Sequence, residues 1–355
     1  MKTADQNSLN LIPLWSGRRG EDGDVVLSTR IRLARNLDVA PFPYHADTGD
    51  LERVAVMCLQ PFRESDDFRD FVLFDINALD EVARAVLVER HLVSASLILE
   101  PAARYAVLSP TGTIAVMINE EDHVRLQCFL PGRNLREAWE IVDGLDDWLS
   151  RSLRWSFSPR FGYLTTHLAN LGTGLRASAM VHLPALTWIG RCNDILRAAT
   201  NLGVAVRGLY GEGSDSAGHI YQVSNRFALG PSEDDILTRV DSTVRFLVKA
   251  EREARGELLS TDHDGVADKA ARSYGILRHA LRMSTREALD LLSYLKLGID
   301  AGLNDFVESR VPLQLFLSVR PAALDSGAGQ TLDVPERERV RATWIRECLQ
   351  TAGGR

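Results

Sequence analysis

Two arginines lie two residues apart in a segment that alternates polar and apolar side chains, Val26–Arg35. This alternation predicts a strand in which Arg30 and Arg32 point to the same face. The apolar side chains expected on the other face are Leu27, Ile31 and Leu33. Planar guanidinium groups form bidentate, charge-assisted hydrogen bonds and stay ionised at physiological pH. The pair therefore suits a polyphosphate, although the sequence carries no P-loop motif.

Three further arginines, Arg125, Arg176 and Arg207, occupy equally patterned short segments. Arg125 follows three consecutive acidic residues and lies four positions after Glu121, a pattern that by itself is common in solvated turns. Arg176 follows a glycine-rich stretch where we expect a helix to begin and to offer free N–H groups to an anion. Arg207 ends a predicted strand, and the glycine loop after it carries Glu212 and suits a lid over a substrate. Together the five arginines predict a phosphate-binding site.

The composition of the 355-residue chain is that of a globular protein with a formal net charge of −7. This charge argues against a general nucleic-acid binder, which would need a basic domain. No apolar run approaches the roughly 18 residues of a membrane span, and the first residues lack the apolar core of a signal peptide. We therefore expect a cytoplasmic protein without membrane contact. The spacing of the cysteines indicates neither a disulfide framework nor a zinc site, and most of them are expected to be buried free thiols: Cys58, Cys128, Cys192 and Cys348.

The order of the predicted elements divides the chain into two domains. Residues 24–133 mix strands with helices, which predicts a layered fold. Apolar spacing and capping signals predict helices over 134–150, 185–202, 232–256, 267–281, 285–301 and 335–350. A polar segment is expected at 259–265 and a flexible stretch at 326–330. We expect a catalytic domain over residues 1–258 and a helical domain over residues 259–355.

The order and spacing of five segments resemble the phosphagen kinase superfamily and most closely its protein arginine kinases: Leu27–Asn36, Leu87–Ser94, Asn119–Arg125, Phe161–Leu183 and Arg207–Leu229. The resemblance implies an α+β catalytic domain, with an antiparallel sheet flanked by helices as in glutamine synthetase, followed by an all-helical C-terminal domain. It also implies that the five arginines grip the phosphates of ATP. Glu121 and Glu212 match the acidic pair that holds the substrate guanidinium, and Mg²⁺ is implied by the nucleotide.

The same resemblance places His91 near the nucleotide, although a histidine on a helix is more often packed in a core. Further contacts to ATP are implied for residues that flank the arginines: Ser28, Thr29, Ile31, Ala177, Ser178, Ala179, Met180, Gly208, Leu209, Tyr210 and Gly211. The chemistry agrees with these roles. A guanidinium is a poor nucleophile until a carboxylate aligns it and accepts a proton, and cationic groups stabilise the transferring phosphoryl group.

One position departs from the family pattern. The family has a reactive cysteine in a Cys-Pro-Thr-Asn segment, whereas this chain reads Thr166-His167-Leu168-Ala169-Asn170. A thiolate would stabilise the guanidinium, while a neutral imidazole only accepts a hydrogen bond and an imidazolium repels it. The loss of one such contact typically costs about 10²–10³ in rate. We expect His167 to be tolerated because Glu121 and Glu212 suffice, and loss of catalysis is the alternative.

The C-terminal part carries a second match. Arg337-Glu338-Arg339-Val340-Arg341-Ala342 resembles the family's Arg-Asp-x-x-Arg-Ala motif, which binds phosphoarginine and regulates the enzyme. Arg337 and Arg341 are one helical turn apart and face the same way, so both could hold a phosphoryl group while Glu338 receives the guanidino part. The alternative from the local sequence is a solvated helix with surface ion pairs.

The resulting hypothesis is a kinase that phosphorylates arginines of proteins with ATP, a mark that in this family directs substrates to a bacterial Clp protease and releases a stress repressor. Phosphagen kinases for free creatine or arginine carry a helical domain ahead of the arginine pair, and here the pair arrives by residue 30. The resemblance therefore disfavours a kinase for free arginine. The remaining alternative is a phosphoarginine-binding regulator without catalysis. The partners expected from the resemblance are protein substrates with an exposed arginine, a second copy in a homodimer, a zinc-binding activator protein and a Clp ATPase.

Overall fold

A nine-stranded sheet positions the five arginines, and β2 (Val26–Arg35) lies near its centre. The computed structural model describes residues 1–4, 20–99, 102–208 and 216–352. The strand order is β1-β3-β4-β5-β6-β2-β9-β11-β10, and all neighbours pair antiparallel except β1 and β3. The other strands are β1 (Lys2–Thr3), β3 (Val72–Asp75), β4 (Tyr105–Leu108), β5 (Ile114–Ile118), β6 (Val124–Pro131), β9 (Leu175–His182), β10 (Val204–Gly208) and β11 (Ile220–Asn225). β7 (Phe157–Ser158) and β8 (Gly162–Tyr163) form a separate hairpin.

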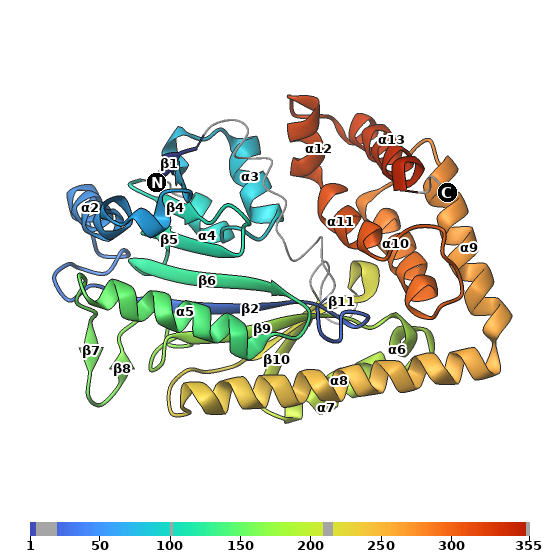
Figure 1. Cartoon of the computed structure of the whole chain (residues 1–355), viewed down its shortest axis with the longest axis horizontal. Coiled ribbons are helices and arrows are strands. Elements are labelled where there is room, and N and C mark those ends of the chain that lie inside the picture. The colour runs from blue at the N-terminus through green and yellow to red at the C-terminus, as the bar shows by residue number, and fades with distance from the viewer. Residues whose placement is uncertain (5–19, 100–101, 209–215, 353–355) are drawn as a thin grey trace.

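Helices lie on the sheet and extend beyond it (Figure 1). Those of the first part are α2 (Thr48–Glu64), α3 (Glu81–Glu89), α4 (Ala95–Leu99), α5 (Leu135–Ser150), α6 (Pro184–Trp188), α7 (Cys192–Asn201) and α8 (Glu233–Thr261), with short 3-10 turns η2 (Asp66–Phe68), η3 (Ile76–Ala78) and η4 (Ala217–His219). Those of the C-terminal part are α9 (His263–His279), α10 (Thr285–Asp300), α11 (Arg310–Ser318), α12 (Pro321–Ala328) and α13 (Val334–Ala352). This arrangement confirms the predicted α+β class with a helical C-terminal part.

The two faces of the sheet have opposite characters. One face is apolar and packs on α5 and α8, with Ile31, Leu33 and Ala177 in the shared core. The other face carries the arginines at one end and apolar side chains at the other. There Phe129 and Met180 pack against the C-terminal helices. Leu27 was expected on the same face as Ile31, but its side chain lies in this second cluster. The reason is a register irregularity between Val26 and Ser28, which reverses the alternation of side chains between the two faces.

Several predicted boundaries were wrong. The helix expected to end near residue 256 continues to Thr261, and only Asp262 separates α8 from α9, so the expected polar segment 259–265 is mostly helical. The Asp262 carboxylate accepts a hydrogen bond from the Gly265 N–H and caps α9. The stretch 326–330, expected to be flexible, lies mostly in α12, which is followed by the C-cap residue Gly329 with φ 69°. The single helix expected over 185–202 is divided into α6 and α7.

The domain division stays a prediction, since α8 runs through the expected boundary between residues 258 and 259. Three of the four cysteines are buried free thiols, Cys58, Cys128 and Cys192, while Cys348 is partly exposed. No helix in the described part of the chain is long and apolar enough to cross a membrane.

Candidate active site

Strand register brings the five arginines to one face of the sheet. Residues that pair directly across neighbouring strands point to the same side. Arg32 lies opposite Arg176 of β9, and Ala34 of the same face lies opposite Arg125 of β6. Arg207 of β10 lies opposite Gln222 of β11, and Gln222 lies opposite Met180 of β9. Because Met180 lies on the same face as Arg176, Arg207 also points to this face. The sequence predicted the shared face of Arg30 and Arg32, and pairing between strands adds the other three.

Three of these arginines have unmet hydrogen-bonding capacity. Arg30 Nη2 donates to Gln222 Oε1 at 3.2 Å, and Arg176 Nη2 donates to Ser224 Oγ at 3.3 Å, so both acceptors are neutral. The buried Nε atoms of Arg30, Arg32 and Arg176 have no hydrogen-bond partner among the described residues. A bidentate anionic ligand would supply the missing acceptors.

The charges of this cluster also oppose one another. Burial, with Arg176 and Arg125 nearby, lowers the pKa of Arg30 to about 10. Burial and the neighbouring arginines lower the pKa of Arg32 well below its usual value, and burial with Arg207 and Arg125 lowers the pKa of Arg176. Like charges held together in a partly buried site are unfavourable until a counter-ion arrives. The arginine face is therefore complementary to a polyanion.

Arg125 differs because the protein itself supplies its anions. Its Nη1 donates to Glu120 Oε1 at 2.8 Å, and its Nη2 donates to Glu121 Oε2 at 2.9 Å. Burial alone would lower the pKa of Arg125, but Glu120 and Glu121 outweigh it and raise the pKa. Ser94 donates to Glu120, and Ser96 donates to Glu121 Oε1 at 3.1 Å. Sequence reasoning missed Glu120 and both serines.

The loop that carries His167 is anchored beside Glu121. The carboxylate of Asp122, which is fully buried, accepts from the Thr166 N–H and from Asn36 Nδ2, each at 2.7 Å through Oδ1. Thr166 Oγ1 donates to the main-chain oxygen of Glu121 at 2.8 Å. His167 Nε2 then lies 3.6 Å from Glu121 Oε1. The histidine at the family's cysteine position therefore contacts the predicted substrate carboxylate.

The far end of this loop is anchored by Arg35, which is buried against Asp146 with an Nη2 to Oδ2 distance of 2.7 Å. Its guanidinium carbon lies 3.5 Å from the ring centroid of Tyr163, and its Nη1 donates to Thr173 O at 3.0 Å. The helix expected to begin in this region is absent: Leu175–His182 is β9, whose N–H groups belong to the sheet. The predicted anion site at a helix N-terminus was therefore wrong.

His91 lies at the arginine face, just after α3, with φ 58°. Its ring stacks on Phe129 with centroids 6.2 Å apart, and its main-chain oxygen accepts from Gln127 Nε2 at 2.9 Å. Burial, with Arg30 and Arg320 nearby, lowers the pKa of His91 well below its usual value, so the ring is neutral near pH 7. A neutral ring beside Arg30 is compatible with a base-stacking or hydrogen-bonding contact.

The other residues predicted to contact the nucleotide lie on both faces of the sheet. Ser178 and Met180 pair with Arg30 and Ser28 on the arginine side of the sheet. The side chains of Ile31, Ala177 and Ala179 lie instead in the core of the opposite face, and Thr29 Oγ1 donates to Gly132 O at 2.7 Å. Gly208 ends β10 directly after Arg207. The predicted residues Leu209, Tyr210, Gly211 and Glu212, with the expected lid, lie outside the described residues.

The predicted phosphoarginine-binding residues already have protein partners. Arg337 pairs with Asp325 at 2.8 Å and also donates to Leu332 O at 2.7 Å. Arg341 is buried and donates to Val319 O at 2.7 Å and to Met283 O at 2.8 Å. Glu338 pairs with Arg282 at 2.7 Å, and Ala342 lies in the helical core. A phosphoryl ligand would therefore compete with these acceptors for Arg337 and Arg341.

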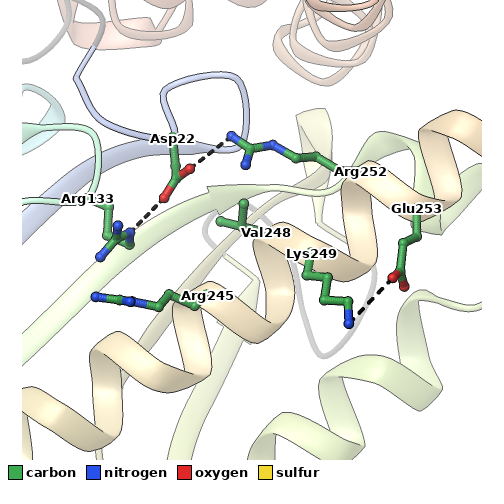
Figure 2. Close-up of a pocket in the computed structure, with 7 residues that line it drawn as sticks. All are labelled: Asp22, Arg133, Arg245, Val248, Lys249, Arg252 and Glu253. Atoms are coloured by element: carbon green, nitrogen blue, oxygen red, sulfur yellow. Dashed lines mark hydrogen bonds and ion pairs between the residues drawn. The ribbon is translucent and has the colours of Figure 1, made fainter.

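A surface groove of about 520 Å³ lies along α8 (Figure 2). This helix packs on the apolar face of the sheet, opposite the arginine face. Figure 2 shows Arg133 and Arg252 turned toward Asp22, and Lys249 toward Glu253. The distances are 2.7 Å from Arg133 to Asp22 and 2.9 Å from Arg252 to Asp22. Because these cations have acidic partners, the groove is a network of ion pairs rather than a second phosphate site.

Comparison with known proteins agrees with this geometry. The family model of the ATP:guanido phosphotransferase C-terminal catalytic domain matches residues 54–254, and that of the protein-arginine kinase McsB C-terminal domain matches residues 263–354. The chain is 42% identical to a protein-arginine kinase of Halothermothrix orenii over 94% of this chain and 96% of that protein. It is 40% identical to a protein-arginine kinase of Bacillus pumilus over 95% of this chain and 93% of that protein.

Solved structures show the same fold. Lombricine kinase has a TM-score of 0.58 at 23% identity, with 72% of each chain covered. The duplicated taurocyamine kinase of Schistosoma mansoni, with bound transition state analog components, has a TM-score of 0.60 at 26% identity, covering 81% of this chain and 41% of that one. From the identity and coverage of these relatives, the chain belongs to the protein-arginine kinase family of ATP:guanido phosphotransferases.

Proposed function

We propose that this protein transfers the γ-phosphoryl group of ATP to guanidinium groups of arginines in protein substrates. The observation that carries the proposal is the arginine face, where the Nε atoms of Arg30, Arg32 and Arg176 have no hydrogen-bond partner among the described residues. The same face carries Arg125, which holds the predicted substrate carboxylate Glu121. A polyphosphate supplies both the missing acceptors and the missing negative charge. Membership of the protein-arginine kinase family supports a protein as the phosphoryl acceptor.

The proposed roles follow from position. The arginine face binds the phosphates and stabilises charge on the transferring group, which is most of what phosphoryl transfer requires of a protein. Glu121 aligns the substrate guanidinium so that one nitrogen faces the phosphorus. Glu212 is the expected second carboxylate. Mg²⁺ would neutralise phosphate charge; the two described carboxylates nearest the cluster, Glu120 and Glu121, are bonded to Arg125, so phosphate oxygens would hold most of the ion.

The test is peptide mass spectrometry at non-acidic pH, after incubation of the purified protein with Mg·ATP and casein. The proposal predicts phosphoarginine in casein, lost with Glu121→Gln. Glu257→Gln, which removes an exposed carboxylate at the far end of α8, is the matched control and should retain transfer. No arginine phosphorylation by the wild-type protein, under conditions in which a related kinase is active, would reject the proposal.

The biological role is a further part of the proposal and depends on the family resemblance. Phosphoarginine would mark substrates for a bacterial Clp protease and regulate a stress response in the cytoplasm. Partners would be a second copy, a zinc-binding activator protein and a Clp ATPase. The division into a catalytic domain over 1–258 and a regulatory helical domain over 259–355 belongs to the same proposal, as does allosteric control through Arg337 and Arg341.

A further inference from the structure

His167 lies where a proton could leave the active site. Glu121 uses Oε2 for Arg125, at 2.9 Å, and presents Oε1 to Ser96 at 3.1 Å and to His167 Nε2 at 3.6 Å. The carboxylate is partly buried, with 30% of its side chain exposed, whereas the His167 side chain is 60% exposed. The imidazole therefore lies between this carboxylate oxygen and bulk solvent, at ion-pair distance from Glu121.

Phosphorylation of a guanidinium releases one proton. The attacking nitrogen forms a bond to the γ-phosphorus, the bond from that phosphorus to the bridging oxygen breaks, and ADP leaves with the electron pair. The proton on the attacking nitrogen must be accepted by another group. The carboxylate that aligns the guanidinium is the nearest acceptor, so the proton first reaches Glu121.

Glu121 is a poor final acceptor. Although burial acts in the opposite direction, Arg125 lowers the pKa of Glu121 below its usual value, with His167 and Ser96 contributing. A carboxylic acid of this kind holds a proton only briefly. Imidazole takes up protons between about pH 5 and 8 and has two nitrogens, so it can accept a proton at one and release another from the second.

We infer that His167 accepts the transferred proton from Glu121 through Nε2 and passes a proton to water from Nδ1. This role depends on the proposed kinase function and gives the family's cysteine position a different task in this chain. Glu121 is the charged group that faces His167 directly, from the turn between β5 and β6. Behind it lie Arg125 of β6, bonded to the other oxygen, and the neutral Ser96 of α4.

The inference has a kinetic consequence. An imidazolium at His167 would pair with Glu121 and compete with the substrate guanidinium for the same oxygen. The reaction therefore starts from neutral His167, and kcat/KM for a protein substrate should rise with pH only while the imidazole of His167 is present.

The experiment measures initial rates of casein arginine phosphorylation from pH 5.5 to 9 for wild type, His167→Ala, His167→Asn and His167→Cys. We expect His167→Ala and His167→Asn to lower kcat about 10²-fold at pH 7.5 and to lose the rise with pH. Added imidazole should restore the phosphorylation rate of His167→Ala in a saturable manner. The restored rate should change when the added imidazole is replaced by a more basic or a less basic derivative. His167→Asn should not respond, because its amide fills the space.

His263→Ala is the matched control, since it removes an imidazole that is 61% exposed and lies at the start of α9. Its rates should equal wild type and should not change with imidazole. If His167→Ala behaves like this control while wild type phosphorylates arginine, the inference is wrong and the proposed function stands. If wild type transfers nothing at any pH, both are rejected.

Discussion

Two groups of arginines in this protein are held in opposite ways. On the sheet face, the Nε atoms of Arg30, Arg32 and Arg176 have no partners among the described residues. On α13, Arg337 and Arg341 donate to a carboxylate and to main-chain oxygens at 2.7–2.9 Å. The family resemblance implies a phosphoryl ligand for both groups, but in the second group the protein already supplies acceptors to both arginines.

The difference lies in what each arrangement costs the folded protein. A cluster of like charges without acceptors destabilises the ligand-free fold, so its residues are retained for binding rather than for stability. Arginines whose donors satisfy buried carbonyl groups stabilise the fold directly. Substitutions on the sheet face should therefore lower activity more than stability, and substitutions on α13 should lower stability more than activity.

The largest effect is expected for Arg176→Ala on the sheet face. Loss of one arginine that stabilises the transferring phosphoryl group should lower kcat by about 10³-fold or more. The midpoint of thermal unfolding should stay unchanged or rise, because repulsion from Arg207 and Arg125 is relieved. Steady-state kinetics and calorimetry check both values, with the exposed Arg272→Ala of α9 as the control. A variant that unfolds easily and keeps its kcat would contradict the assignment.

Arg341→Ala should have its main effect on stability. The change leaves the main-chain oxygens of Val319 and Met283 without their buried donor, which should lower the free energy of unfolding by about 2–4 kcal/mol. Urea denaturation measures this value. Arg339→Ala, at an exposed position of the same helix, should change it by less than about 0.5 kcal/mol. Equal stability of the two variants would show that Arg341 is not structural.

The smallest effect is expected at Asp325, which holds Arg337 in the present arrangement. If the motif binds phosphoarginine, Asp325→Asn should free Arg337 and tighten binding of a phosphoarginine peptide about tenfold, because one competing ion pair is removed. Isothermal titration calorimetry provides the measurement. The double variant with Arg337→Ala should lose the gain. Unchanged or weaker binding by Asp325→Asn would mean that Asp325 is part of the ligand site instead of its competitor.

Local periodicity predicted most helices and the shared face of Arg30 and Arg32, while the family resemblance predicted the α+β class. Neither predicted the partners of Arg125 and Arg337. Glu120 lies five residues before Arg125 across a turn, and Asp325 lies on another helix, so neither pairing has a local pattern. The helix expected after Gly174 failed for a related reason: pairing of β9 with both β2 and β11 outweighs the glycine signal.

The sequence also did not predict the bulge in β2 or the position of the loop that carries His167. The bulge that moves Leu27 to the other core is set by the pairing of β2 with β9. The contact between His167 and Glu121 depends on Asp122, whose buried carboxylate holds the loop at Thr166. Neither follows from the spacing of residues along one segment.

The most direct test of the unfilled arginine face is the thermal unfolding of Arg32→Ala with and without Mg·ATP. Without nucleotide, the variant should unfold at the same or a higher temperature than wild type, because Arg32 is repelled by Arg30, Arg125 and Arg176. When the ATP concentration is 100 times its Kd, the free energy of unfolding of wild type should increase by about 2.7 kcal/mol. The free energy of unfolding of the variant should increase much less. A variant less stable than wild type that keeps the full gain with ATP would contradict the account.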